Sequence, residues 1–71
     1  MEIIFTNHSQ IRIEERGISL LRIRETIKKP DKSQISYLAT SKVSKKYGNK
    51  TLEVVFRQNR GKVVVITAYY L

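Results

Sequence analysis

Pro30, the only proline of the chain, separates two different spacings of apolar residues. Before it, Leu20, Ile23 and Ile27 follow the i, i+3, i+7 spacing that places apolar side chains on one face of a helix. After it, apolar residues alternate with polar ones, which is typical of strands with one buried face. A proline cannot continue a helix through its interior, so the helix must end here. The sequence therefore predicts helices before Pro30 and a sheet after it.

The N-terminal part contains one predicted strand and two predicted helices. Glu2 to Phe5 is a brief apolar run rich in β-formers, which predicts a first strand. A short helix is expected from about Ser9 to Arg16, with Gly17 as its stop. Ser19 is expected to cap a second helix that runs to about Lys29.

Three strands are predicted after Pro30. The alternating residues of the first two are Ile35, Tyr37 and Ala39, then Leu52, Val54 and Phe56. The basic stretch Ser41 to Lys50 between them is expected to be a loop, with Tyr47, Gly48 and Asn49 as its turn signal. Asn59, Arg60 and Gly61 are expected to form a tight hairpin turn. The last run, Lys62 to Leu71, is apolar on both faces, which predicts a central strand.

Strict alternation divides the last strand into two faces. One face carries Val63, Val65, Thr67 and Tyr69, and the other carries Val64, Ile66, Ala68 and Tyr70. The last three strands are expected to form an antiparallel meander, with the first strand on the free side of the last. The predicted fold is α+β, in the order β-α-α-β-β-β. Two helices are expected to pack on one face of a four-stranded, mainly antiparallel sheet.

The chain has 71 residues and no cysteine. This length suits one small domain, which buries a thin core. Disulfides and thiol chemistry are excluded, and a structural zinc site is not expected with a single histidine. We expect no metal and no cofactor. Oligomerisation or a binding partner is a plausible source of extra stability, so the sequence is compatible with a monomer or a homodimer.

The net charge of +8 arises from 14 Lys and Arg against 6 Asp and Glu. Such a field attracts polyanions, and the candidate partners are RNA, DNA, an anionic membrane surface or an acidic protein segment. Membrane binding is the least supported of these, because no transmembrane run or strongly amphipathic basic helix is present. Without a signal-peptide pattern, the expected location is the cytoplasm. The alternative reading is that the lysines merely keep a small protein soluble.

His8, Arg12 and Arg16 form a column on the predicted first helix, because residues four apart project from neighbouring positions. An imidazole titrates near neutral pH and could act as general base or general acid in RNA cleavage. The two guanidinium groups could hold a phosphate bidentately. The alternatives are that His8 supports the strand-to-helix junction and that the arginines pair with carboxylates. One such pair would be a buried Arg16–glutamate contact that fastens the helix to the sheet.

A second cluster of interest lies in the predicted basic loop. Its members are Lys42, Lys45, Lys46, Tyr47 and Lys50. Lysines around an aromatic ring can follow an RNA backbone and stack on a base. An ordinary solvated hairpin loop is the alternative.

Several spaced elements resemble a known family. They are Phe5-Thr6-Asn7-His8-Ser9, Arg12, Arg16-Gly17-Ile18-Ser19, Lys29-Pro30-Asp31 and the final Gly61–Tyr69 strand with Thr67. In this order they resemble the domain-of-unknown-function family 4258 (DUF4258) over nearly the whole chain. That family is similar in expected fold to RelE-like toxins and the wider barnase and colicin-type ribonucleases.

The resemblance implies that residues 1–71 form a single RelE-like α+β domain. The positions that are characteristic of the family's members correspond here to His8, Arg12, Arg16, Thr67 and Tyr69. Tyr69 could stack on a base or donate a proton, while Thr67 and Tyr69 could instead be core residues. The chain has no second histidine, so a paired-histidine mechanism is impossible.

The function expected from these features is that of a small RNA-directed, toxin-like protein. It would be a metal-independent endoribonuclease that cleaves by 2′-hydroxyl attack, with catalytic residues His8, Arg12, Arg16 and Tyr69. An acidic antitoxin would be its natural protein partner. The alternatives are a non-catalytic nucleic-acid-binding or regulatory module, and an accessory domain that docks an acidic protein.

Overall fold

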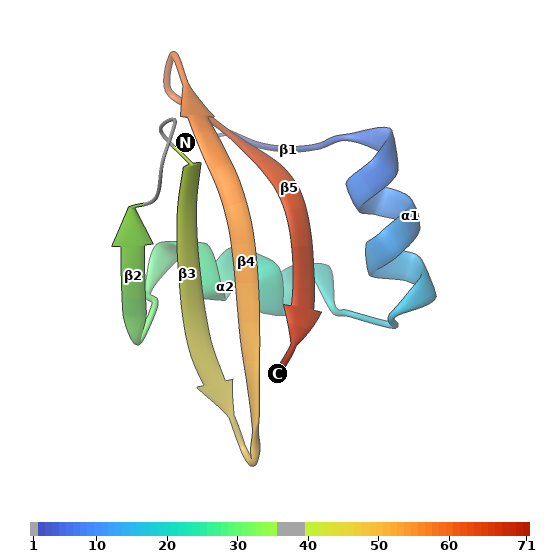
Figure 1. Cartoon of the computed structure of the whole chain (residues 1–71). Coiled ribbons are helices and arrows are strands. Elements are labelled where there is room, and N and C mark those ends of the chain that lie inside the picture. The colour runs from blue at the N-terminus through green and yellow to red at the C-terminus, as the bar shows by residue number, and fades with distance from the viewer. Residues whose placement is uncertain (1, 36–39) are drawn as a thin grey trace.

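The computed structural model describes residues 2–35 and 40–71 and has an α+β architecture with two helices and a five-stranded mixed sheet (Figure 1). In chain order, its elements are β1 (Glu2–Phe5), α1 (Asn7–Glu15), α2 (Leu20–Lys28), β2 (Lys32–Ile35), β3 (Thr40–Tyr47), β4 (Lys50–Asn59) and β5 (Lys62–Tyr70).

The strands lie in the order β1-β5-β4-β3-β2. From β2 to β5 the sheet is an antiparallel meander, and β1 pairs in parallel with β5 on its free side. The predicted position of the first strand is confirmed. β5 lies inside the sheet, as expected for a run that is apolar on both faces, but the central position belongs to β4.

The prediction of four strands is wrong, because most of the expected basic loop is a strand. Residues 40–47 form β3, which pairs with β4 from Thr40↔Arg57 to Tyr47↔Lys50. In β3 only Val43 is fully buried, so the apolar alternation that identifies a strand is nearly absent. Of the first strand predicted after Pro30, Ile35 ends β2, whereas Tyr37 and Ala39 lie outside the described residues.

Both hairpin turns occur where the sequence predicts them. β3 and β4 are joined through Gly48 and Asn49, with Gly48 at φ 65°. β4 and β5 are joined through Arg60 and Gly61, both of which have positive φ. Two consecutive positive φ values are the signature of the two-residue type I′ turn, which matches the twist of antiparallel strands.

Side-chain and backbone caps define the two helices. The Thr6 hydroxyl accepts from the Ser9 N–H at 3.1 Å, so α1 begins two residues before the predicted start. Ser19 caps α2 as predicted. At the end of α1, Gly17 adopts φ 63°, and the Ile18 N–H donates to the Ile13 carbonyl. These features make a Schellman turn, which brings Ile13 and Ile18 into the same apolar core.

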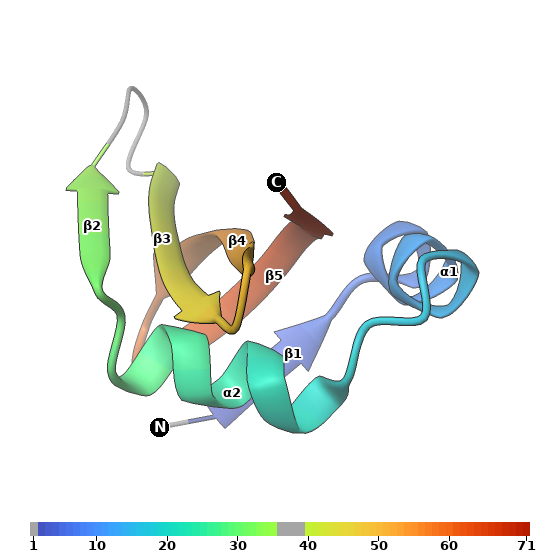
Figure 2. The same cartoon turned by 90° about the horizontal axis from the view of Figure 1, so that it is seen from below.

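The two helices occupy different positions relative to the sheet (Figure 2). α2 crosses one face and packs against β3 and β4, whereas α1 packs against β5. β1 pairs with β5 only as far as Phe5↔Val65, and α1 flanks the part of β5 beyond it. The expectation of two helices on one sheet face is therefore not confirmed.

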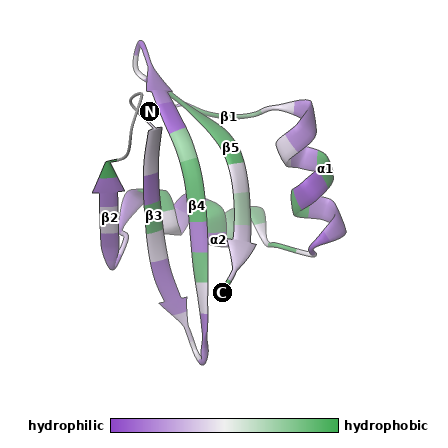
Figure 3. Ribbon diagram, in the orientation of Figure 1, coloured by the Kyte–Doolittle hydropathy of each residue, from purple (hydrophilic) through white to green (hydrophobic). Residues whose placement is uncertain are grey.

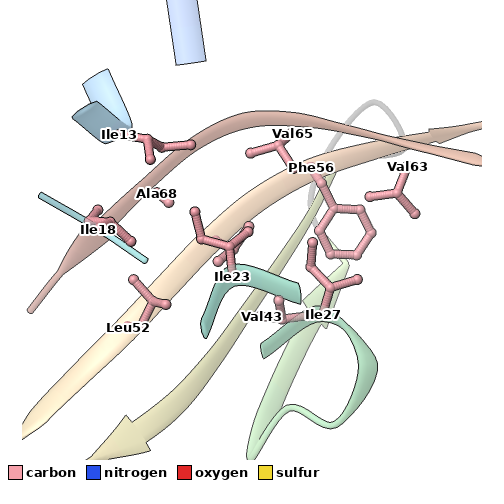
Figure 4. Close-up of a cluster of buried hydrophobic side chains, with 11 residues drawn as sticks. Ile13, Ile18, Ile23, Ile27, Val43, Leu52, Phe56, Val63, Val65 and Ala68 are labelled. Carbon is pink, nitrogen blue, oxygen red and sulfur yellow. The ribbon is translucent and has the colours of Figure 1, made fainter. Parts of the chain in front are cut away.

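The core lies between α2 and the sheet (Figure 4). Ile23 is fully buried there, and Ile27 lies one turn further along α2. The sheet contributes Val43, Leu52, Val54, Phe56, Val63, Val65 and Ala68. In β4 every second residue from Leu52 to Phe56 is buried, although Val55 between them is also apolar. Green and purple bands accordingly follow one another along this strand (Figure 3). We call the face toward α2 the core face and the opposite one the outer face.

A β-bulge changes the alternation within β5. Val55 pairs with Thr67, but its neighbour Phe56 pairs with Val65, so Ile66 is an extra residue in the ladder. Ala68 consequently returns to the core face and is fully buried. The predicted division of the strand is therefore wrong beyond Val65: Thr67 and Tyr69 lie on the outer face, opposite to the core.

Candidate functional site

Arg16 connects the end of α1 to the uncovered edge of β5. Its Nη1 donates to the Ala68 carbonyl at 2.9 Å and to the Thr67 hydroxyl at 3.3 Å. The Ala68 carbonyl lies beyond the last residue paired with β1, so the guanidinium satisfies a backbone group that β1 does not reach. Arg16 thus fastens α1 to the sheet through a carbonyl and a hydroxyl, rather than through the carboxylate that the alternative reading supposed.

Tyr69 lies next to Arg16 on the outer face and directly opposite Glu53 of β4. Burial raises the pKa of the Tyr69 hydroxyl, and its hydrogen bond with the Glu53 carboxylate and that group's charge raise the pKa further. The positive charge of Arg16 acts in the opposite direction. Tyr69 is therefore a neutral phenol at physiological pH, able to donate its proton in a hydrogen bond to Glu53.

Glu53 also faces Lys42 on β3. The Lys42 Nζ lies 4.0 Å from Glu53 Oε1, and the Glu53 side chain is only 14% exposed. Lys42, Glu53, Tyr69 and Arg16 therefore form a row across β3, β4, β5 and the end of α1. We call these four residues the cross-strand row.

Two hollows of the surface contain Glu53. One is lined by Lys32, Ser33, Gln34, Lys42, Ser44 and Glu53. The other shares Lys32, Ser44 and Glu53 and adds Asp31, Lys45, Lys46, Thr51 and Leu71. On this side of the row two carboxylates, those of Asp31 and Glu53, and hydroxyl groups thus lie among several lysines, an arrangement suited to a ligand that carries both phosphates and hydroxyls.

The structure brings together only part of the predicted catalytic set. Arg16, Thr67 and Tyr69 meet at β5, whereas His8 lies in the first turn of α1, about 12 Å from Arg16 along the helix axis at 1.5 Å per residue. Among the described residues, His8 has no hydrogen-bond or ion-pair partner. Arg12 pairs with Glu15 of its own helix at 3.4 Å, with both side chains about half exposed.

The predicted lysine cluster is divided between the two sheet faces. Lys42 and Lys46 alternate onto the outer face. Lys45 instead donates to the Lys29 carbonyl at the end of α2 and lies 3.9 Å from Asp31. Lys50 lies over the Tyr70 ring, with Nζ 5.6 Å from its centroid.

Tyr47 packs against α2. Its hydroxyl donates to the Glu25 carboxylate at 3.1 Å, and the Arg22 guanidinium lies 4.6 Å from the ring centroid. Burial raises the pKa of the Tyr47 hydroxyl; its hydrogen bond with Thr26 opposes this, and Glu25 reinforces it. One face of the ring is thus covered by Arg22, on the side of the sheet away from the cross-strand row.

Glu53 is the member of the row that the sequence analysis missed. Its position opposite Tyr69 depends on the strand register, which the bulge at Ile66 shifts. The alternation of Leu52, Val54 and Phe56 already placed Glu53 on the solvent side of β4, and that signal could have identified it.

No helix among residues 2–35 and 40–71 has the length and apolar character needed to cross a membrane. Within the same residues, no group of three or more His, Cys, Asp or Glu side chains is placed to hold a metal ion.

One family model matches the chain. Its description is Domain of unknown function (DUF4258), and the match covers residues 5–70, which include the whole cross-strand row. No curated protein and no solved structure matches.

Proposed function

The chain belongs to the DUF4258 family, and we propose that it binds a single RNA strand on its outer face and cleaves it as a toxin-like endoribonuclease. The reaction is metal-independent. The 2′-oxygen attacks the adjacent phosphorus and the bond to the 5′-oxygen breaks, leaving a 2′,3′-cyclic phosphate and a 5′-hydroxyl. Kinship with RelE-like ribonucleases and an acidic antitoxin partner for the +8 charge are parts of the same proposal.

The cross-strand row is the observation that supports this proposal. It joins a carboxylate, a phenol, an ammonium and a guanidinium group from four separate elements on one face. RNA cleavage needs groups that move protons and cations that stabilise charge on the phosphate. These chemical types are adjacent here, with the outer-face lysines available to hold the rest of the strand.

Arg16 is assigned to the scissile phosphate. Both of its hydrogen bonds to β5 use Nη1, so its Nε and Nη2 donors remain for a ligand. The bonds to β5 hold the guanidinium in one orientation, which lowers the entropy cost of binding a phosphate. Arg12 and Lys42 would bind neighbouring parts of the strand.

His8 is assigned to proton transfer, as the sole imidazole of the chain. It is exposed in the first turn of α1, and a strand that follows the helix from Arg16 would bring RNA toward it.

Cleavage of RNA oligonucleotides in EDTA tests the proposal. We expect the wild type to release fragments that end in a cyclic phosphate. We expect His8→Ala and Arg16→Ala to lower the rate at least about 100-fold, the usual scale for a general acid–base group or a charge-stabilising donor. Arg24→Ala, which removes an exposed arginine of α2, should cleave like the wild type, and circular dichroism would verify that each variant is folded.

A non-catalytic RNA-binding module is the second candidate. The observation in its favour is the structural bonding of Arg16, which gives this residue a reason to be present without catalysis. Binding with a steep salt dependence and no cleavage by the wild type would support this alternative. Absence of binding to either nucleic acid would contradict both candidates and favour docking of an acidic protein.

A further inference from the structure

We propose that Glu53 is the general base of this site, the group that takes the proton from the 2′-hydroxyl of bound RNA. The assignment rests on the proposed function and gives the base a position distinct from His8. Glu53 was not among the residues that the sequence analysis singled out.

Glu53 lies at the centre of the outer face. It belongs to β4, the central strand of the sheet, and its side chain lies between β3 and β5, opposite Ser44 and Tyr69. It lines both hollows of the outer face that contain Lys32 and Ser44. A ligand in either hollow would therefore meet this carboxylate.

Glu53 has two partners on the neighbouring strands, Tyr69 and Lys42. Tyr69 lies directly opposite Glu53 on β5, where its hydroxyl can donate to the carboxylate. The Lys42 Nζ, 4.0 Å from Glu53 Oε1, offsets its charge. An ionised carboxylate has two oxygens and about four acceptor positions. The contacts with Tyr69 and Lys42 leave acceptor positions free for a hydroxyl group of a ligand.

Two cations, Lys42 and Arg16, belong to the same cross-strand row as Glu53. A carboxylate alone repels a phosphate, but Lys42 and Arg16 lie on opposite sides of the Glu53–Tyr69 pair. Together they can bind the phosphate on either side of the ribose whose 2′-hydroxyl faces Glu53. The preferred ligand is therefore RNA rather than DNA, which lacks that hydroxyl.

In the cleavage step one bond to phosphorus forms and another breaks. Glu53 accepts the 2′-hydroxyl proton while the 2′-oxygen forms a bond to phosphorus. The bond from phosphorus to the 5′-oxygen breaks, and that oxygen takes a proton from a water molecule, since His8, about 12 Å from Arg16, is too far to donate it directly. Glu53 then returns its proton to the solvent, which restores the carboxylate and neutralises the hydroxide.

Tyr69 is a positioning residue in this scheme, because it acts through Glu53. Tyr69→Phe removes the hydrogen bond and keeps the ring. We expect a lower kcat with an unchanged KM, since RNA binding does not depend on the orientation of the carboxylate.

Glu53→Gln and Glu25→Gln form a matched pair for the test. Glu25 also accepts a hydrogen bond from a tyrosine, Tyr47, but it lies on α2 on the other side of the sheet. The measurements are the affinity for a 2′-O-methyl RNA, which cannot be cleaved, and the single-turnover cleavage rate of the matching RNA. We expect Glu53→Gln to bind at least as tightly as the wild type, because it removes a negative charge, and to cleave at least about 100-fold more slowly. Glu25→Gln should match the wild type in both.

Cleavage by Glu53→Gln at the wild-type rate would overturn the assignment while leaving the proposed function intact. A wild type that does not cleave RNA would refute both together. If Glu53→Gln does not fold, Glu53→Asp replaces it, because this variant keeps a carboxylate and retracts it by one methylene. We then expect unchanged affinity and a rate at least about 10-fold lower, and a wild-type rate would again refute the role.

Discussion

At the scale of single residues, Arg16 has both a structural contact and a proposed catalytic one. Its bond to the Ala68 carbonyl spans 52 positions in the sequence and joins α1 to the part of the β5 edge that lies beyond β1. Loss of activity in an Arg16 variant therefore has meaning only when its effect on stability is known.

Arg16→Ala is expected to lower the free energy of unfolding by about 1 kcal/mol, because it leaves a backbone carbonyl without its partner. Arg12→Ala is the matched control. It removes an exposed pair within one helix, so its effect should stay within about 0.5 kcal/mol. Urea denaturation of both variants measures the difference, and equal effects would mean that Arg16 does not hold α1 to the sheet.

Tyr69 and Tyr47 give the fold a sensitivity to alkaline pH. The pKa of each hydroxyl is raised in the folded state, chiefly by burial, so the folded protein retains these protons more strongly than the unfolded chain. Their contribution to stability is complete below about pH 10, the ordinary tyrosine value, and is lost as the pH rises through the folded-state values.

Tyr69→Phe should therefore reduce the decline of stability above about pH 10. The free energy of unfolding of this variant and the wild type, measured by urea denaturation from neutral to alkaline pH, provides the test. Curves that remain parallel across the alkaline range would contradict the raised pKa of Tyr69.

At the scale of elements, α2 anchors the sheet through Ile23, which is fully buried. Ile23→Val is expected to cost about 0.5–1.5 kcal/mol, because it removes one methylene from a packed site. Leu21→Ala should change stability by no more than about 0.5 kcal/mol, since Leu21 is 67% exposed on the same helix. Thermal or urea unfolding separates the two, and a larger effect at Leu21 would contradict the packing of α2.

The helices and hairpin turns could be predicted because their signals are local. Ser19 caps α2, and the spacing of Ile23 and Ile27 gives its buried face. Arg60 and Gly61 specify a turn without reference to the rest of the chain. Each of these features depends on residues only a few positions apart.

β3 could not be predicted, because its stability comes from pairing with β4 rather than from an apolar pattern. Val43 is the one fully buried residue of β3, and lysines occupy several of the other positions. The bulge at Ile66 was missed for a related reason. An extra residue in a ladder is defined by the partner strand, and the apolar run of β5 reads equally well with or without it.

The sequence predicted two residues of the candidate site and missed a third. Arg16 and Tyr69 were chosen from the sequence, and the structure places them together. The third group, Glu53, comes from a neighbouring strand and needs the register to be known. Of the predicted column only Arg16 belongs to the cross-strand row, because His8 lies about 12 Å from it along the helix axis.

At the scale of the whole molecule, the basic charge is divided between the two faces of the sheet. Lys42 and Lys46 lie on the outer face, whereas Lys28 and Lys29 lie at the end of α2. A net charge of +8 attracts RNA to any surface at low salt, so affinity alone does not locate the site.

The salt dependence of binding distinguishes the two faces. For single strands the slope of log affinity against log salt is about −0.7 per neutralised phosphate, so Lys42→Ala with Lys46→Ala should make it shallower by roughly 1.4. Lys28→Ala with Lys29→Ala removes the same charge from the other face and should leave the slope unchanged. A greater effect of the second pair would place the RNA on α2.

The central claim is that RNA occupies the outer face at the cross-strand row, and nuclear magnetic resonance tests it most directly. The measurement is the shift of backbone amide signals on titration with a short single-stranded 2′-O-methyl RNA. We predict that the largest changes fall on Lys42, Glu53, Tyr69 and Arg16, while the amides of α2 remain in place. Changes confined to α2, or none at saturating RNA, would contradict the claim.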